Sequence, residues 1–225
     1  MKVLVPNDKI ISGLAAASAL SGADLVPVVQ GGVTEKATVD QIATFVSRAL
    51  FNASLTTPGA GFASDTYLVG SSIAISAPAT MVQTKTIYRC LFSVARTTAG
   101  TAAPVLTVRF GTAGTTSDFA ACVFTFPAQT GVADEGIFEV FANFRSVGIG
   151  TTASIGGVAR LTHDKGFGST ASTGLSVESA PTVINAGGSG FNSTVANSII
   201  GLSVNGGASA AWTIAIVQAE LLNLA

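Results

Sequence analysis

Apolar and polar residues alternate with a period of two along most of the chain after residue 65. In one such segment Leu106, Val108 and Phe110 share one side, while Thr107 and Arg109 share the other. This alternation is typical of a β-strand that buries one of its two faces. The pattern therefore predicts β structure for the larger part of the chain.

The clearest strand is predicted at Gly136–Arg145, where Phe138, Val140 and Phe144 point inward. Turn signals rich in Gly, Ala, Asn and Thr separate the segments at short intervals. We expect a mainly β fold, an antiparallel β-sandwich with jelly-roll-like connectivity, in which residues 166–197 form long exposed loops. The other predicted strands are Ile87–Val94, Pro104–Phe110, Ala121–Phe126, Ser154–Thr162, Gly174–Glu178, Ser198–Val204 and Ala211–Leu221.

The beginning of the chain follows a different pattern. Two short β-prone runs, Leu25–Gln30 and Val33–Ala37, flank a Gly-Gly pair and predict a hairpin. Pro27 cannot donate a backbone hydrogen bond, so the first run is expected at a sheet edge.

A helix is predicted over residues 39–51. Thr38 and Gln41 have the spacing of a capping box, which satisfies free backbone donors at a helix start. The apolar positions at helical spacing are Val39, Ile42, Ala43, Val46 and Leu50.

Thr57–Gly61 has the composition of a linker. We therefore expect an N-terminal region of hairpin plus helix at residues 1–60 and a β-sandwich domain at 61–225. A hairpin and one amphipathic helix are too little to fold alone, so this region is expected to dock on a partner or on the main domain.

Charged residues are scarce. Only 10% of the 225 residues are charged and the formal net charge is −1, whereas an ordinary soluble domain has about 25% charged residues. Such a surface is best explained if other subunits cover much of it, so we expect a homo-oligomer. The alternative is a monomer whose surface is coated by serine and threonine.

The composition also excludes two classes of partner. Mean hydropathy is +0.57, but no uninterrupted apolar run of about 18 residues is present, so no transmembrane helix is expected. Lys and Arg number 11 against 12 Asp and Glu, without a basic cluster, so no nucleic-acid partner is expected. The start of the chain lacks the pattern of a signal peptide.

Candidate catalytic residues are few. The single histidine, His163, is expected at a strand end in a polar turn, and the adjacent Asp164 is not placed to orient it as in a catalytic triad. The densest acidic pair, Asp134-Glu135, is expected in an exposed turn. Two distant cysteines and one histidine cannot supply a tetrahedral zinc set. The sequence predicts no enzyme activity and no catalytic, metal or cofactor site.

Cys90 and Cys122 lie inside predicted strands. Buried free thiols are the expected state, because nothing in the sequence indicates an oxidising compartment; a disulfide between them is the alternative.

Residues 11–42 resemble an N-terminal attachment module found on many virion proteins of tailed bacteriophages. The runs that carry the resemblance are Leu20–Asp24, Pro27–Gln30 and Gln41–Ile42, together with Leu14 and the Gly-Gly pair. The candidate attachment or assembly residues in this region are Leu14, Asp24, Pro27, Gly31, Gly32, Ile42 and Val46.

Residues 65–162 are similar to a β module of phage structural proteins, through the segments Asp65–Ser71, Tyr88–Phe92, Thr98–Pro104, Phe138–Phe141 and Phe144-Arg145. Together the resemblances imply a non-catalytic structural protein of the virion, either a tail or neck appendage or a capsid-decoration subunit. The implied partners are further copies of the chain, as a homotrimer, and other virion proteins.

Two alternatives stay open at this point. The chain could be a carbohydrate-binding module of a tail fibre, which recognises a host surface glycan through the loops of residues 166–197. A polysaccharide depolymerase would need two carboxylates facing each other across a cleft, and the sequence shows no such pairing.

Overall fold

The computed structural model divides the chain into two compact units, Met1–Ser47 and Arg48–Ala225. The structure describes residues 23–30, 32–39, 41–42, 49–54, 59–75, 82–164, 167, 175–179, 182–183, 191–208 and 211–224.

The first unit contains the predicted hairpin. Strands β1 (Leu25–Gln30) and β2 (Val33–Thr38) pair antiparallel, and Pro27 lies opposite Lys36. Gly32 adopts a positive φ of 83° in the connecting turn, a conformation that costs glycine little. Both strands of a two-stranded sheet are edges, as the proline requires.

The helix start has the predicted hydrogen bonds. The backbone N–H of Thr38 donates to Gln41 Oε1 over 2.8 Å, and the N–H of Gln41 donates to Thr38 Oγ1 over 3.1 Å. Val39, Gln41 and Ile42 have helical backbone, and residues 43–48 lie outside those that the structure describes. The prediction that the helix continues to residue 51 is wrong, because residues 49–51 belong to a strand.

The boundary between the two units also differs from the expected one, because this strand belongs to the second unit. Strands β3 (Ala49–Ser54) and β4 (Gly59–Gly61) both pair with β15 (Trp212–Leu222), near the other end of the chain. The second unit accordingly begins at Arg48, before the boundary expected at residue 60. Residues 49–54 and 59–61 supply strands to the sandwich rather than to the N-terminal region.

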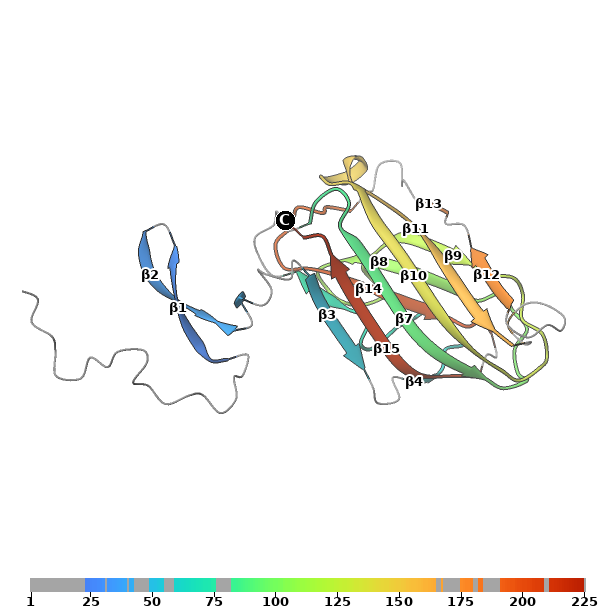
Figure 1. Cartoon of the computed structure of the whole chain (residues 1–225). Coiled ribbons are helices and arrows are strands. Elements are labelled where there is room, and N and C mark those ends of the chain that lie inside the picture. The colour runs from blue at the N-terminus through green and yellow to red at the C-terminus, as the bar shows by residue number, and fades with distance from the viewer. Residues whose placement is uncertain are drawn as a thin grey trace, which may run out of the picture. The chain divides into compact units, whose positions relative to one another are not determined.

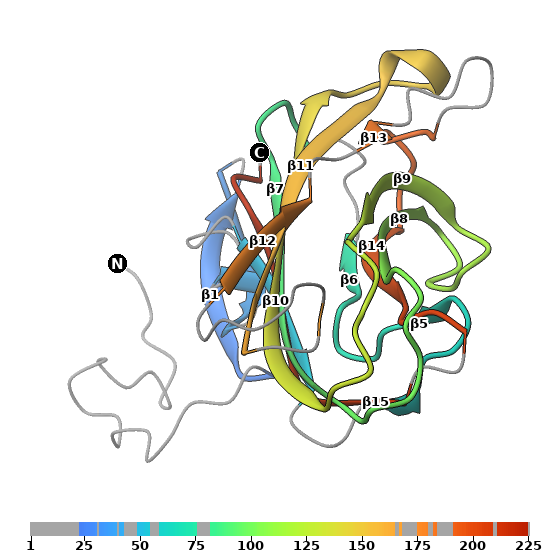
Figure 2. The ribbon, with the colours of Figure 1, turned by 90° about the vertical axis from the view of Figure 1, so that its right-hand side faces the viewer.

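The second unit is mainly β, as predicted, and its strands form two antiparallel sheets that lie face to face (Figure 2). The seven-stranded front sheet runs in the order β12-β11-β10-β7-β15-β3, and β4 also pairs β15. Besides β3, β4 and β15 it contains β7 (Ile87–Arg96), β10 (Asp134–Ser146), β11 (Ser154–His163) and β12 (Leu175–Ser179).

The six-stranded back sheet runs in the order β13-β9-β8-β14-β5, and β6 also pairs β14. Its strands are β5 (Thr66–Tyr67), β6 (Ile73–Ile75), β8 (Val105–Gly111), β9 (Phe119–Thr125), β13 (Thr182–Val183) and β14 (Ser198–Asn205). A short 3-10 helix, η2 (Gly150–Thr152), lies between β10 and β11. All eight strands predicted from residue 87 onward are present within a few residues of their expected ends.

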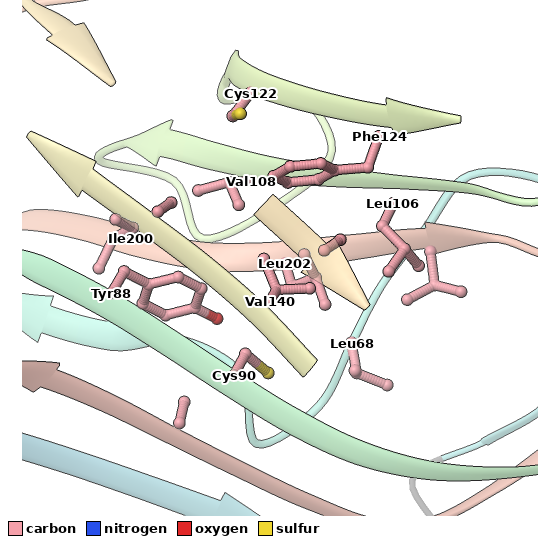
Figure 3. Packing of buried hydrophobic residues seen from close by; sticks show 14 of the residues in the cluster. Leu68, Tyr88, Cys90, Leu106, Val108, Cys122, Phe124, Val140, Ile200 and Leu202 are labelled. Carbon is pink, nitrogen blue, oxygen red and sulfur yellow. The ribbon is translucent and has the colours of Figure 1, made fainter. Parts of the chain in front are cut away.

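The core lies between the sheets and follows the predicted alternation (Figure 3). Phe138, Val140 and Phe144 on β10 are fully buried, as are Leu106 and Val108 on β8. Figure 3 shows side chains from both sheets meeting in one apolar layer. Burial of these alternating side chains is the main stabilising contribution to such a sandwich.

An aromatic group fills one end of this core. Phe138 stacks on Phe92 with ring centroids 5.0 Å apart and also contacts Phe126, Phe167 and Trp212. Because the ring is completely buried among other rings, its removal would leave a cavity that the neighbours cannot fill.

We predict that Phe138→Ala lowers the free energy of unfolding by about 3–5 kcal/mol, from the lost transfer energy and the cavity together. Urea unfolding followed by fluorescence measures the loss. Ile149→Ala is the matched control, because Ile149 is 68% exposed and its truncation should change stability by less than about 0.5 kcal/mol. Equal losses in the two variants would contradict this assignment of the core.

Candidate functional site

The structure describes four of the seven predicted attachment residues. Asp24, Pro27, Gly32 and Ile42 lie on or next to the hairpin, and the Asp24 carbonyl accepts a 3.0 Å hydrogen bond from the N–H of Val39. This bond joins the entry of β1 to the residue that follows β2. Three further candidates, Leu14, Gly31 and Val46, lie outside the residues that the structure describes.

The hairpin presents apolar side chains on both faces. Leu25 and Val29 alternate onto one face and are 60% and 73% exposed, while Val33 lies opposite Gln30 on the other face and is 60% exposed. Among the described residues of the first unit, no second layer covers either face of this two-stranded ribbon, and such a ribbon is marginally stable alone. Exposed apolar residues in this arrangement indicate a contact surface.

A buried polar cluster closes one end of the sandwich, where sequence analysis expected exposed turns. His163 Nδ1 lies 3.0 Å from Asp134 Oδ2, and both side chains are fully buried. The Asp134 carboxylate also accepts hydrogen bonds from the backbone N–H groups of Glu135, Asp164 and Phe167. The expectation of an exposed Asp134 is therefore wrong. His163 lies at a strand end, as expected, but it is buried rather than placed in a polar turn.

This pair holds two strand ends together. Residue 134 begins β10 and residue 163 ends β11, so the carboxylate joins the two ends and the chain that follows β11. His163 Nε2 is buried and makes no hydrogen bond among the described residues, so no described hydroxyl or thiol is positioned for it to activate. The cluster can anchor the fold, and among the described residues no nucleophile is hydrogen-bonded to the imidazole as a catalytic triad would need.

We predict that Asp134→Ala destabilises the protein by about 3–5 kcal/mol, because four donors lose their acceptor in a buried site. Glu135→Ala, at the exposed neighbouring position, serves as the control and should stay within about 0.5 kcal/mol of the parent. Urea unfolding of both variants tests this prediction. Similar losses would show that burial of the carboxylate contributes little.

A second polar cluster lies on the outward side of the back sheet. Arg109 Nε donates to Ser203 Oγ over 2.7 Å, one terminal nitrogen donates to the Asp118 carbonyl over 2.8 Å, and the other pairs with Asp65. The Tyr67 hydroxyl lies where a side chain at Gly201 would sit. The guanidinium therefore connects the segment around β5 to β8, β9 and β14.

Arg96 plays a similar part at the end of β7. It donates to the carbonyls of Ala99, Gly100, Thr130 and Val132, and so connects two loops. Both arginines are occupied by the fold, which favours structural roles over ligand binding.

Both cysteines are buried free thiols, as predicted. Burial raises the pKa of the Cys90 thiol to about 12 and that of the Cys122 thiol to about 11. The thiolate is the reactive form, so both side chains are protonated and unreactive near neutral pH.

We predict that iodoacetamide at pH 8 modifies both cysteines in folded protein at least about 100-fold more slowly than in urea-unfolded protein. Mass spectrometry measures the two rates. The raised pKa also gives the sign of a pH effect, because the unfolded chain loses these protons first. Stability is retained below the ordinary thiol pKa of about 8.5 and falls as pH rises toward 11 and 12. Fast modification of the folded protein at pH 8 would contradict the burial.

Metal-ligand residues do not gather anywhere in the described part of the chain, where no group of three or more His, Cys, Asp or Glu could hold an ion. Within the same residues, no helix has the length and apolar composition needed to cross a membrane.

Comparison with known proteins adds no family assignment. The chain matches no family model and no curated protein.

Proposed function

We propose that this chain is a non-catalytic structural subunit of a bacteriophage particle. It is a homo-oligomer, with three copies expected, and its N-terminal region attaches it to other virion proteins. The observation that carries the proposal is the hairpin, whose strands expose Leu25, Val29 and Val33 on two opposite faces. Covering both faces requires surfaces that a two-stranded ribbon does not itself supply.

The resemblance of residues 11–42 to a phage attachment module supports the same role. Four of the residues in question, Asp24, Pro27, Gly32 and Ile42, cluster at this hairpin and at the helix start that follows it. An attachment element needs an accessible apolar surface on a compact scaffold, and β1 and β2 provide one.

The connectivity of the sandwich supports a jelly roll. Strands pair in a nested order: β8 with β9, β7 with β10, β6 with β14 and β3 with β15. Early and late strands therefore form one long ribbon that is folded over into two sheets. Double-sheet jelly rolls of this kind occur in viral capsid proteins, among other proteins.

The scarcity of charge supports assembly. With a net charge of −1 over 225 residues, electrostatic repulsion between copies is weak. Asp134 and Arg96 are buried, and Arg109 is hydrogen-bonded to Ser203 and Asp118, so these charges do little to solvate the surface.

We predict that Val29→Glu lowers the number of copies incorporated per phage particle at least tenfold, because a carboxylate at a 73% exposed apolar contact must be desolvated on attachment. Quantitative immunoblotting of purified particles measures incorporation. Immunogold labelling of parent particles distinguishes a capsid position from a tail or neck position.

Val69→Glu is the control, since Val69 is 61% exposed but lies in the second unit between β5 and β6. It should be incorporated like the parent chain. The proposal fails if the parent chain is absent from particles, or if it stays monomeric in sedimentation at all concentrations.

A further inference from the structure

The exposed apolar side chains of the described sandwich strands gather on one face. Phe51 on β3, Ile137 on β10 and Ile216 on β15 are 63%, 47% and 46% exposed. All three belong to the front sheet, and each has a chain neighbour that packs in the core (Leu50, Phe138 and Val217), so the three side chains point away from the core. Figure 1 views the sandwich from this side, with β3, β15, β7 and β10 in front. We call this surface the outer face of the front sheet.

The back sheet does not share this property. On its described strands no large apolar side chain is among the strongly exposed ones. Its outward side instead carries the polar cluster of Arg109, Asp65 and Ser203. The two sheets therefore differ in the chemistry of their outer surfaces, although both bury apolar side chains in the same core.

A bulge in β15 increases the apolar content of the outer face. The register with β7 shifts between Ile214 and Val217, so Ala215 and Ile216 are both exposed. The N–H of Ile216 donates to Ser93 Oγ over 3.2 Å, which holds the bulge in place. Bulges commonly redirect side chains toward a functional surface.

Next to the bulge the outer face is hollowed. A depression of about 740 Å³ lies over β7, β10 and β15, and several of the residues that line it are small, among them Ser93, Ala95 and Ala215. Ile137 and Glu135 also line it. A protruding aromatic side chain of another molecule would bury about 150–250 Å² there. Phe51 on the same face has this shape, but it lies on the edge strand β3 rather than over the depression.

The charges at the centre of the outer face are already paired. Arg89 on β7 contacts Glu139 on one neighbouring strand at 3.1 Å and Glu220 on the other at 3.7 Å. Its guanidinium also lies 5.4 Å from the ring centre of Phe141. A cation that is already paired and stacked costs less to cover than an isolated one.

Two further exposed charges, both on β10, could pair with charges on a second copy. Glu135 and Arg145 lie near opposite ends of β10 and are both exposed, and the Arg145 guanidinium extends over Gly156. One molecule thus carries both members of a complementary pair on one face. Another copy of the same face can provide the opposite charge.

The area of the outer face is close to the area that one partner buries in a standard protein interface. Five strands spaced by about 4.8 Å and ten residues at about 3.3 Å each span roughly 20 by 30 Å, about 600 Å² before side-chain relief is counted. A standard protein interface buries about 800 Å² per partner.

We infer that a second copy of this chain covers the outer face of the front sheet and places an apolar side chain such as Phe51 in the depression. The inference rests on the proposed homo-oligomer and specifies one contact within it. Two copies of the same face meet about a two-fold axis, so this contact joins copies in pairs and is separate from the contacts around the three-fold axis of a trimer. It also accounts for the three large apolar side chains that this face exposes, Phe51, Ile137 and Ile216.

The first test is Ile137→Glu, compared with Ile149→Glu, in sedimentation equilibrium of the full chain. Ile149 is 68% exposed on a loop and is the matched control. Ile137→Glu should weaken self-association at least tenfold, because it places an unpaired carboxylate in the contact. Ile149→Glu should associate like the parent.

If the parent assembles and Ile137→Glu assembles equally well, the inference fails while the proposed structural role stands. If the parent stays monomeric, both fail.

A second test does not depend on the folding of a charged variant. Gln218→Cys places a thiol on the exposed side of β15, and Ile149→Cys places one on the loop. The rate of labelling with a thiol reagent should fall at least tenfold with rising protein concentration for Gln218→Cys alone. A rate that does not change with concentration overturns the inference, whether the face is open or is covered by the chain's own N-terminal unit.

Discussion

The sandwich depends on one constraint: each strand can offer only every second side chain to the core. Phe138, Val140 and Phe144 on β10 meet Leu106 and Val108 on β8 in a single apolar layer. The other long strands of both sheets repeat the arrangement. This layer fixes the register of every strand, because a slip of one residue would turn its apolar side chains outward. The same constraint leaves each sheet with a second face, and the chemistry of those two outward faces distinguishes one side of the molecule from the other.

The polar residues that are buried serve this layer. The Asp134 carboxylate contacts His163 and accepts hydrogen bonds from three backbone N–H groups, where β10 begins and β11 ends. Arg96 binds four carbonyls of two loops, and Arg109 connects strands on the back sheet. Each holds strand ends or loops together through hydrogen bonds made within the fold, as is usual for buried polar groups. Several of the few charged side chains are thus bonded within the fold. The outer surface accordingly consists to a greater extent of apolar and small polar side chains.

The two candidate contact surfaces follow from this distribution. The hairpin of β1 and β2 has apolar residues on both sides and no second layer of its own, while the front sheet exposes Phe51, Ile137 and Ile216 beside a depression. In the proposed phage subunit they have separate tasks, since the hairpin attaches the chain to other virion proteins and the outer face joins copies of the chain. Each surface can be disrupted by one substitution without touching the core, so the two roles can be separated by experiment.

The sequence by itself determined the strands from residue 87 onward, the hairpin and the capping box. These features depend on alternation, turn residues and spacing, which are local properties of the chain. Only the tertiary structure decided that residues 49–54 form β3, because the ladder with β15 is supplied from the far end of the chain and overrides the helical spacing of Leu50. It likewise decided that Asp134 is buried against His163, 29 residues away, and that the outer face of the front sheet exposes Phe51, Ile137 and Ile216. Burial and pairing of this kind depend on which distant strands become neighbours. The local sequence pattern does not determine which strands pair.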